Sequence, residues 1–531
     1  MSISLMKIFL IGIALGLVGM DAYSTISSDT VVPGSSPAIL DRVFINARGL
    51  DRIGELSWNN PALMTYRYRE SECSATLGYN SEKSDRPIVS AEGNGRQAMS
   101  IGADAYIHSG NSTVWGAASY DNGKILSPLW NESGTVSPIS PYLLADSIGG
   151  NLSRESYSFS GGYAHSSDKL LWGVEGGYKA ELSYRKIDPR PRNITGDLNI
   201  KGGLGWRLSP DYIGGLSLRY NHYRLSTDVS FVNETGETKL FHLTGLGSHY
   251  VRFDGAGRSV YNDYNAGELS LNLLPVADRG GFLNISGSLM KMRHVIEDLN
   301  RLPLADIDNK SFQIQAGYKG SANRNVHSSD LNGFRYAIWG EWYADKRLGT
   351  ENIFGDATSG SYPLIGSLTL YRDNLFGGSL SGFTGWTRGN FSVYVIPTLG
   401  WRHQRIVHLT DNREWLDEHL NLTLDSRFSM LFKRAGYISF QAGIEGIIPT
   451  SSLISLPSPG TSPEDKILYN LTMSDFKAAT ASRVAFNAGA EWLYSFSTRL
   501  SGGIFAGFSN LHIANGITSR CWTIGITARF I

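Results

Sequence analysis

The sequence predicts an all-β protein, a transmembrane antiparallel up-and-down β-barrel of about eighteen strands, with sixteen or fourteen strands as the alternatives. Three observations lead to this prediction. The chain ends on a segment that alternates apolar and polar residues, its connections alternate between short and long, and it contains 60 glycines and 11% aromatic residues. Tightly paired strands with aromatic belts at the two membrane surfaces have this composition.

The C-terminal segment 522–531 has two distinct faces when it is read with the period of a strand. Thr523, Gly525, Thr527 and Arg529 suit water, and the opposite face suits lipid. This ending resembles the terminal strand that bacterial outer-membrane proteins present to their insertion machinery. The resemblance implies an outer-membrane protein whose partners are lipid, the barrel-insertion machinery and periplasmic chaperones. The insertion signal would be the apolar face, which consists of Trp522, Ile524, Ile526, Ala528 and Phe530.

Two internal segments show the same alternation. In 420–433 and in 484–496, leucine and aromatic residues alternate with polar residues such as Asp425, Arg427 and Glu491. A secreted β-sandwich has a similar pattern. The length of these segments, the C-terminal ending and the asymmetry of the connections favour the barrel.

The connections predict the orientation of the chain. Outer-membrane barrels have short periplasmic turns and long extracellular loops. We therefore expect both termini in the periplasm and the long loops outside the cell. The short turns are expected at 108–111, 166–168, 209–211, 387–390, 433–436 and 497–499, and the long loops at 121–154, 226–264, 294–309, 346–362, 408–419 and 451–479.

The N-terminal part predicts two further regions ahead of the barrel. Lys7, an apolar run over 8–18 and Ala22-Tyr23-Ser24 are typical of a secretory signal peptide, which we place at 1–24. Residues 25–71 contain only short mixed segments, whereas the barrel is expected at 72–531. A barrel of this size holds water unless something fills it. We therefore predict that 25–71 is a plug in the lumen.

Composition argues against several other classes of protein. Lys plus Arg and Asp plus Glu both total 48, so no excess charge attracts nucleic acid. No stretch after the signal peptide is long and apolar enough for a transmembrane helix. Cys73 and Cys521 are expected on opposite faces and at different heights, so we predict no disulfide. We expect no cofactor, no metal site and no enzyme activity, and the histidines and aspartates of 403–419 are interpreted as solvated rim residues.

A short motif before the first strand resembles a known family. Trp58-Asn59-Asn60-Pro61-Ala62 is similar to the Asn-Pro-Ala element of the outer-membrane long-chain fatty-acid transporters and of related Bacteroidota secretion barrels. The resemblance implies that these residues form a hatch inside the barrel. That family has fourteen strands, so the chain as a whole looks more like the large Bacteroidota barrels of unassigned role. The other interpretation is a simple turn, because a residue before proline favours extended geometry.

Charged residues at inward positions leave two functions open. They line a solute path in a porin-like channel or transporter for a small or hydrophobic solute, or they hold the plug and satisfy one another. The alternative to transport is a structural subunit of a surface complex, because the loops at 126–130 and 453–457 offer apolar residues to a protein partner. If the plug lies in the lumen, charges such as Asp51, Arg52 and Glu55 should pair with the wall. The predicted inward charges are Glu175, Lys179, Lys201, Arg219, Arg335, Glu341, Asp345, Arg402, Asp425, Arg427, Glu491 and Arg529.

Overall fold

The computed structural model describes residues 38–233, 237–321, 332–358, 360–432 and 436–531. The chain divides into two units, Met1–Ala38 and Ile39–Ile531, and the second holds the barrel. The predicted signal peptide, residues 25–37 of the predicted plug and most of the predicted turn at 433–436 lie outside the described residues.

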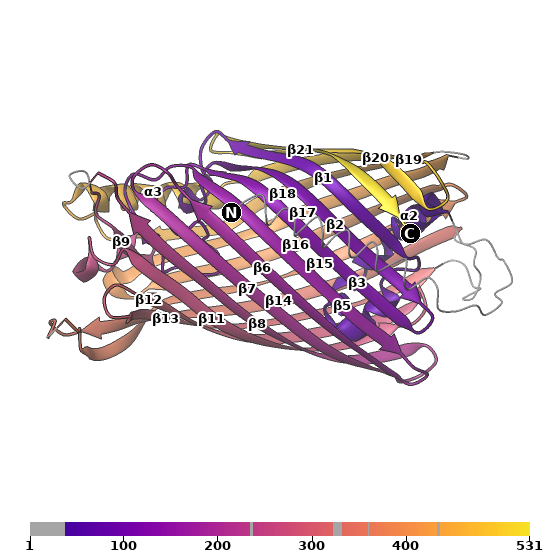
Figure 1. The fold of residues 1–531 in the computed structure, drawn as a ribbon, viewed down its shortest axis with the longest axis horizontal. Helices are drawn as coiled ribbons and strands as arrows, with labels where there is room; N and C mark the ends of the chain where they lie inside the picture. The colour runs from indigo at the N-terminus through magenta and orange to yellow at the C-terminus, as the bar shows by residue number, and fades with distance from the viewer. Residues whose placement is uncertain (1–37, 234–236, 322–331, 359, 433–435) are drawn as a thin grey trace. The chain divides into compact units, whose positions relative to one another are not determined.

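Eighteen strands form one closed antiparallel sheet (Figure 1). The barrel closes because β1 (Glu72–Ser84) pairs with β2 (Gly95–Ser109) on one side and with β21 (Ile517–Phe530) on the other. This confirms the predicted fold class and strand number. The remaining strands of the wall are β3 (Ser112–Leu126), β5 (Leu152–Ser166), β6 (Leu170–Tyr184), β7 (Arg190–Arg207), β8 (Tyr212–Ser230), β11 (Ser259–Pro275), β12 (Gly280–Ile296), β13 (Leu302–Ser321), β14 (Gly333–Phe354), β15 (Leu364–Arg388), β16 (Phe391–His408), β17 (Arg413–Phe432), β18 (Gly436–Ser455), β19 (Arg483–Ser495) and β20 (Leu500–Ile513).

The two ends of the barrel differ. The short-turn end carries the C-terminus, on the right of Figure 1, and the loop end carries the long connections, on the left. The loop-end connections contain η4 (Ser90–Glu92), β4 (Leu144–Ala145), β9 (Phe241–Gly245), β10 (Ser248–His249), η6 (Val251–Phe253), η7 (Thr410–Asn412) and α3 (Pro463–Ala479), and β4, β9 and β10 make a small separate sheet.

The middle of the wall has an apolar outer face. Leu422 and Leu424 on β17 and Trp522, Ile524 and Ile526 on β21 expose between 45% and 63% of their surface, although they are large and apolar. Such residues suit lipid, and polar residues alternate with them on the inner face. No helix among the described residues is long and apolar enough to cross a membrane.

The same strands reverse this pattern at the loop end. On β8, Leu225 and Val229 are buried inside the barrel, whereas Arg224 points outward and is exposed. On β12, Met292 is buried inside while Lys291 is exposed outside. The wall therefore continues past the apolar band, with water outside and packed loops inside. The long loops predicted at 226–264 and 294–309 are shorter than expected, because the first and last residues of both ranges belong to strands.

The reversed face supports a second hydrophobic core at the loop end. Leu144 and Phe253 from the connections pack against Val260, Ile296 and Leu304 on the wall. The connections at the loop end, which contain η4, β4, β9, β10, η6, η7 and α3, thus form a compact cap, which we call the lid.

Both cysteines are free, as the sequence predicts. Cys73 lies opposite Phe530, whereas Cys521 lies opposite Glu82 at the other end of β1. They are therefore separated by most of the length of that strand.

Candidate functional site

Residues 39–71, which we call the inner segment, pack against the inner wall near the short-turn end. The segment contains α2 (Ile39–Asn46) and three 3₁₀ helices, η1 (Leu50–Arg52), η2 (Glu55–Asn59) and η3 (Pro61–Tyr66). Val43 and Phe44 of α2 pack against Tyr437 and Leu493 of the wall. A second apolar cluster, around Ile53, takes in residues of β12, β14, β15 and β16.

The Asn-Pro-Ala motif docks where the wall has no side chains. Gly173 and Gly203 are direct cross-strand partners on β6 and β7, and Gly215 lies on β8. A Cβ atom on Gly173 would lie 2.5 Å from the carbonyl carbon of Pro61, and one on Gly203 would collide with the Asn60 side chain. We call these three residues the glycine cradle. Only glycine lets the segment's backbone approach the wall so closely.

Both polar atoms of the Asn60 side chain form hydrogen bonds. Its Oδ1 accepts from the backbone N–H of Ala62 at 3.0 Å, which caps η3, and Pro61 occupies the first helical position. Its Nδ2 donates to Asn272 Oδ1 at 3.1 Å. Asn60 is fully buried, whereas the adjacent Asn59 is exposed.

A row of buried amides extends this contact across the wall. Asn272 donates to Asn284 at 2.9 Å, Asn284 donates to Gln315 at 3.1 Å, and Gln315 donates to Glu341 at 3.4 Å. Ser57 of the inner segment also donates to Asn284, at 2.9 Å. We call Asn272, Asn284 and Gln315 the amide ladder. Sequence reasoning missed it, although its members are polar residues at inward positions of β11, β12 and β13.

Three of the charges expected to pair with the wall do not do so. Among the described residues, Asp51, Arg52 and Glu55 form no ion pair with the wall strands, whereas Arg69 pairs with Asp278, between β11 and β12, at 3.0 Å. Amides and apolar side chains make the contacts of η2 and η3 with the wall. These contacts avoid the cost of desolvating a charge on each side.

Most of the predicted inward charges pair with a charged or amide side chain. Arg529 is central, because it binds Glu72 of β1 and Glu491 of β19 at 2.9 Å each. The other ion pairs are Glu175 with Lys201 at 2.8 Å, Lys179 with Glu181 at 3.0 Å, Arg219 with Glu268 at 3.7 Å, Arg335 with Asp278 at 3.7 Å and Arg427 with Glu491 at 3.7 Å. Three of the charges form hydrogen bonds with amide side chains: Asp345 with Asn309 at 2.8 Å, Glu341 with Gln313 at 2.7 Å and Arg402 with Gln404 at 2.7 Å. Asp425 faces Gly443.

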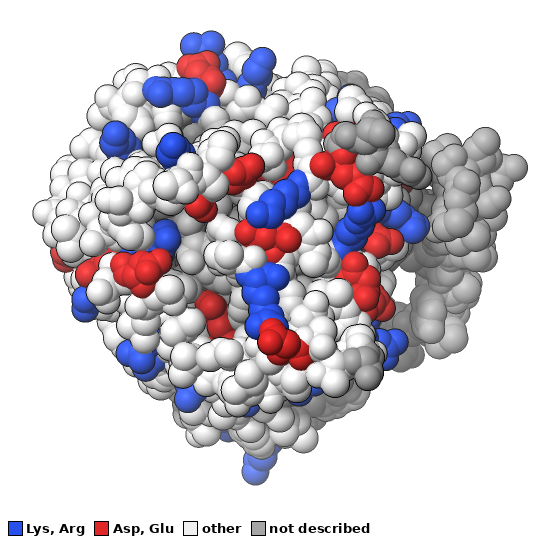
Figure 2. Space-filling model, turned by 90° about the vertical axis from the view of Figure 1, so that its left-hand side faces the viewer, with Lys and Arg blue, Asp and Glu red and all other residues white. Residues whose placement is uncertain are grey.

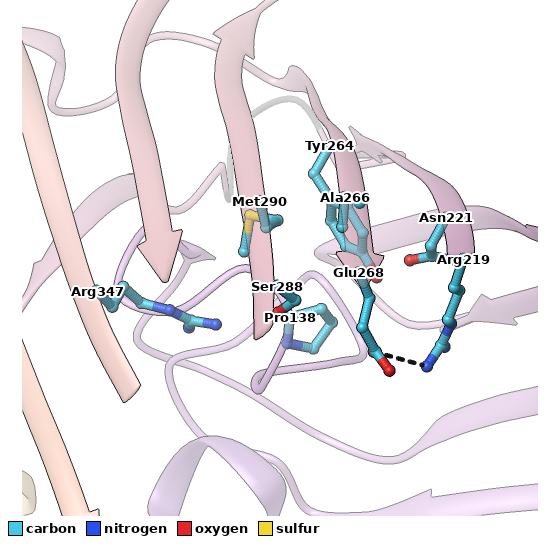
Figure 3. A pocket seen from close by; sticks show the side chains of 10 residues that line it. Pro138, Arg219, Asn221, Tyr264, Ala266, Glu268, Ser288, Met290 and Arg347 are labelled. Carbon is cyan, nitrogen blue, oxygen red and sulfur yellow. Dashed lines mark ion pairs between the residues drawn. The ribbon is translucent and has the colours of Figure 1, made fainter. Parts of the chain in front are cut away.

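A cavity of about 210 Å³, lined by both charged and apolar side chains, lies inside the wall where the lid meets it. Figure 3 shows Arg219 and Glu268 side by side on neighbouring strands, with Arg347 approaching from β14 and Pro138 from the lid. Arg347 also donates to the carbonyl of Ser140 at 2.9 Å, so it links the wall to the lid. We call this space the inner cavity.

A second cavity, of about 420 Å³, lies under the lid and has two unlike sides. Leu129, Leu243 and Leu468 of the lid make one side apolar, whereas Arg402 and Asp417 of the wall make the other side charged. We call it the lid cavity. Figure 2, which looks onto the loop end, shows the mouth filled by the connections, with acidic and basic side chains alternating across it.

Helix α3 is held to other parts of the lid near both of its ends, by two contacts that we call latches. Near its C-terminal end, Asp475 accepts from the backbone N–H and the hydroxyl of Ser90 at 3.0 and 2.6 Å. Near its N-terminal end, Asp465 lies 3.2 Å from His249, whose other ring nitrogen lies 2.8 Å from Asp254.

Both latches titrate. Burial raises the pKa of Asp475 to about 6, although the hydrogen bonds from Ser90 oppose this shift. Burial lowers the pKa of His249, but its hydrogen bonds to Asp254 and Asp465 outweigh burial and raise that pKa above its usual value.

The first lid connection is anchored by a buried ion pair. Arg185, just beyond β6, binds both oxygens of Glu132 at 2.7 and 2.8 Å, with Asp146 at 3.7 Å. Burial and the nearby Asp146 raise the pKa of Glu132, because one guanidinium serves two carboxyl groups.

Two of the histidines interpreted as solvated rim residues are buried, whereas His403 is partly exposed and Asp411 is exposed. His408 and His419 are almost fully buried, and each contacts a carboxylate, Glu351 at 2.9 Å and Asp417 at 3.3 Å respectively. His408 links β16 to β14, whereas His419 contacts a carboxylate of its own strand, β17. Within the described ranges, no three His, Cys, Asp or Glu side chains gather as metal ligands would.

A family model matches residues 61–530, from Pro61 of the cradle contact to the end of β21. Its description is "Family of unknown function (DUF6850)". The chain belongs to this family. No curated protein matches the DUF6850 chain.

Solved structures show distant likeness to this DUF6850 protein. The ferric enterobactin receptor of Pseudomonas aeruginosa is 10% identical with a TM-score of 0.36, over 87% of this chain and 81% of that chain. The ferric preacinetobactin receptor of Acinetobacter baumannii is 9% identical with a TM-score of 0.38, over 87% and 80%. A FadL homologue from Pseudomonas aeruginosa is 12% identical with a TM-score of 0.31, over 94% and 98%. These likenesses are weak.

Proposed function

We propose that this DUF6850 protein is an outer-membrane channel or transporter of the Bacteroidota type, with the inner segment as its gate. The observation that carries the proposal is the way in which the segment is held. At the glycine cradle and the amide ladder it docks through neutral groups. Such contacts exchange readily for contacts with water, so this part of the segment can leave the wall without separating an ion pair.

The polar lumen supports passage of a solute. Carboxylates and cations are paired along the inner wall, and one of these pairs, Arg219 with Glu268, lines the inner cavity. A lumen with both signs of charge disfavours strong selection for one ionic charge. The lid cavity combines an apolar and a charged side, which suits a small solute with apolar groups. The solute is proposed to pass from the lid cavity to the inner cavity and then along the inner segment.

The proposal includes an orientation. Short turns are periplasmic in barrels of this kind, and long connections face outward. The short-turn end, with the inner segment and the C-terminus, would then face the periplasm. A periplasmic partner could pull on the segment from there, whereas the lid would meet solute first.

A steric wedge tests the gate. Gly203→Ala places a methyl group against Asn60, so we expect the inner segment to be displaced and uptake of small polar dyes by proteoliposomes to rise severalfold. Gly202→Ala is the matched control, because a Cβ atom there meets nothing within 4 Å. Equal uptake by the wild type and both variants, together with unchanged exposure of Asn60, would reject the cradle as the seat of the gate.

The alternative is a structural subunit of a surface complex. Exposed apolar residues at the loop end favour it, including Val251 at 72%, Ile365 at 70% and Leu453 at 50%. The same proteoliposomes separate the two functions. If Gly203→Ala exposes Asn60 but uptake stays at the background level, and a stable protein partner co-purifies with the chain, the scaffold function replaces transport.

A further inference from the structure

The outer wall carries a basic cluster just above the apolar band at the loop end. Lys310 on β13 and Lys346 on β14 are direct cross-strand partners, and both are exposed. Arg405 on β16 lies in the same row, since Asn374 on β15 pairs with both Lys346 and Arg405. Arg372 lies one step higher on β15.

The two lysines are placed unfavourably for a protein in water. Like charges directly opposite each other in a sheet repel and are destabilising. Nevertheless, among the described residues no carboxylate pairs with Lys310, Lys346 or Arg372, whereas the neighbouring Lys291 pairs with Asp308 at 3.6 Å and Arg405 with Glu414 at 2.7 Å. Carboxylates of the wall thus neutralise Lys291 and Arg405, whereas the positive charges of Lys310, Lys346 and Arg372 have no such partner among the described residues.

Aromatic residues lie immediately below this cluster. Phe312 follows Lys310 by one outward step and contacts Trp342, with ring centroids 5.9 Å apart. Phe376 contacts Trp401 in the same way at 5.4 Å. Aromatic rings of this kind mark the level of lipid headgroups, so the cations lie where headgroup phosphates lie.

We propose that Lys310, Lys346 and Arg372 form a binding site for the phosphate groups of the outer-leaflet glycolipid, lipid A. The inference rests on the proposed orientation, in which the loop end faces outward, and does not depend on transport. A phosphate between the two lysines removes their repulsion and accepts charge-assisted hydrogen bonds from both. The acyl chains then lie on the aromatic and aliphatic band below.

Native mass spectrometry of the purified full-length chain tests this site with three probes: phosphorylated lipid A, the same lipid after removal of its phosphates, and inorganic phosphate. We expect the wild type to retain phosphorylated lipid A and to bind the dephosphorylated lipid at least tenfold more weakly. Lys310→Gln with Lys346→Gln should weaken the phosphorylated lipid roughly ten- to thirtyfold, since each surface cation contributes separately to attraction by anionic lipid.

Lys124→Gln with Lys186→Gln is the matched control, because both lysines are exposed at the loop end and the change in charge is the same. Equal weakening in the control, or equal retention of the dephosphorylated lipid, would overturn the site. Displacement of the lipid by millimolar inorganic phosphate would reassign the cluster to a free anion. Heat-modifiable migration of each variant verifies that the barrel is folded. If lipid binding is retained but no dye is taken up, the lipid A site is supported and the transport function is rejected.

Discussion

At the scale of single residues, Asn59 and Asn60 are adjacent in the motif but lie in opposite environments. Asn60→Ala removes the cap of η3 and one bond to the amide ladder, and it leaves Asn272 with a buried unpaired acceptor. We expect the docking of residues 54–66 to weaken by about 1–3 kcal/mol. Hydrogen exchange of that stretch measures the loss as faster exchange of its backbone amides.

Asn59→Ala serves as the control, because Asn59 is exposed. Its exchange should match that of the wild type within error. Similar acceleration in both variants would mean that the motif contributes through helix propensity and not through the contact with the wall.

The sequence points to some of these residues and not to others. The motif at 58–62 is visible as a motif, and Gly203 is recognisable as a strand glycine that something approaches closely. The amide ladder is not recognisable, because Asn272, Asn284 and Gln315 look like ordinary inward polar residues. Their contact depends on the register between β11, β12 and β13, which a single sequence does not reveal.

At the scale of elements, α3 should respond to pH. Burial raises the folded-state pKa of Asp475 from its ordinary value of 3.8 to about 6, so docking favours the protonated acid and is lost as pH rises through about 6. The raised pKa of His249 acts in the same direction, because its stabilisation is present below its ordinary pKa and is lost as pH rises past the folded value. Hydrogen exchange in α3 should therefore be faster at pH 8 than at pH 5, after correction for intrinsic rates.

Asp475→Asn isolates one of these latches. The amide keeps an acceptor for Ser90 but carries no charge, so the part of the pH dependence centred near 6 should disappear and only the His249 part should remain. An unchanged profile would show that Asp475 does not control the docking of α3.

The strands show where pattern reading succeeds and where it fails. Within the apolar band, as at Leu422 and Leu424, period-two alternation correctly identifies the outward face. At the loop end the rule inverts, because Leu225 and Met292 face a folded lid while Arg224 faces water. The alternation persists there, but its polarity depends on what lies on either side, and that information comes from distant loops.

At the scale of the whole molecule, the barrel is closed by a seam between β1 and β21, and Arg529 spans it. Arg529→Ala leaves Glu72 and Glu491 without this partner inside the lumen. We expect a loss of about 1–3 kcal/mol and a lower temperature for the heat-modified shift on a gel. Arg520→Ala on the same strand changes an exposed outward residue and should leave that temperature unchanged. If both variants shift equally, the effect belongs to net charge and not to the seam.

Two contacts with different sequence separations, one at the amide ladder and one in the lid, set an order for assembly of the barrel. The contact between Asn60 and Asn272 spans 212 residues, whereas the contact between Ser90 and Asp475 spans 385. Contacts between more distant residues form later, and the second one needs nearly the whole wall to be present. A nascent barrel would therefore gain the contact at Asn60 while the wall is still incomplete, whereas the lid and the packing of α2 against Tyr437 and Leu493 would form only after the last strands have paired. Cysteine labelling at position 60 during pulse-chase assembly should show protection before α3 becomes resistant to protease. The motif at Asn60 would then occupy part of the lumen before the barrel is complete.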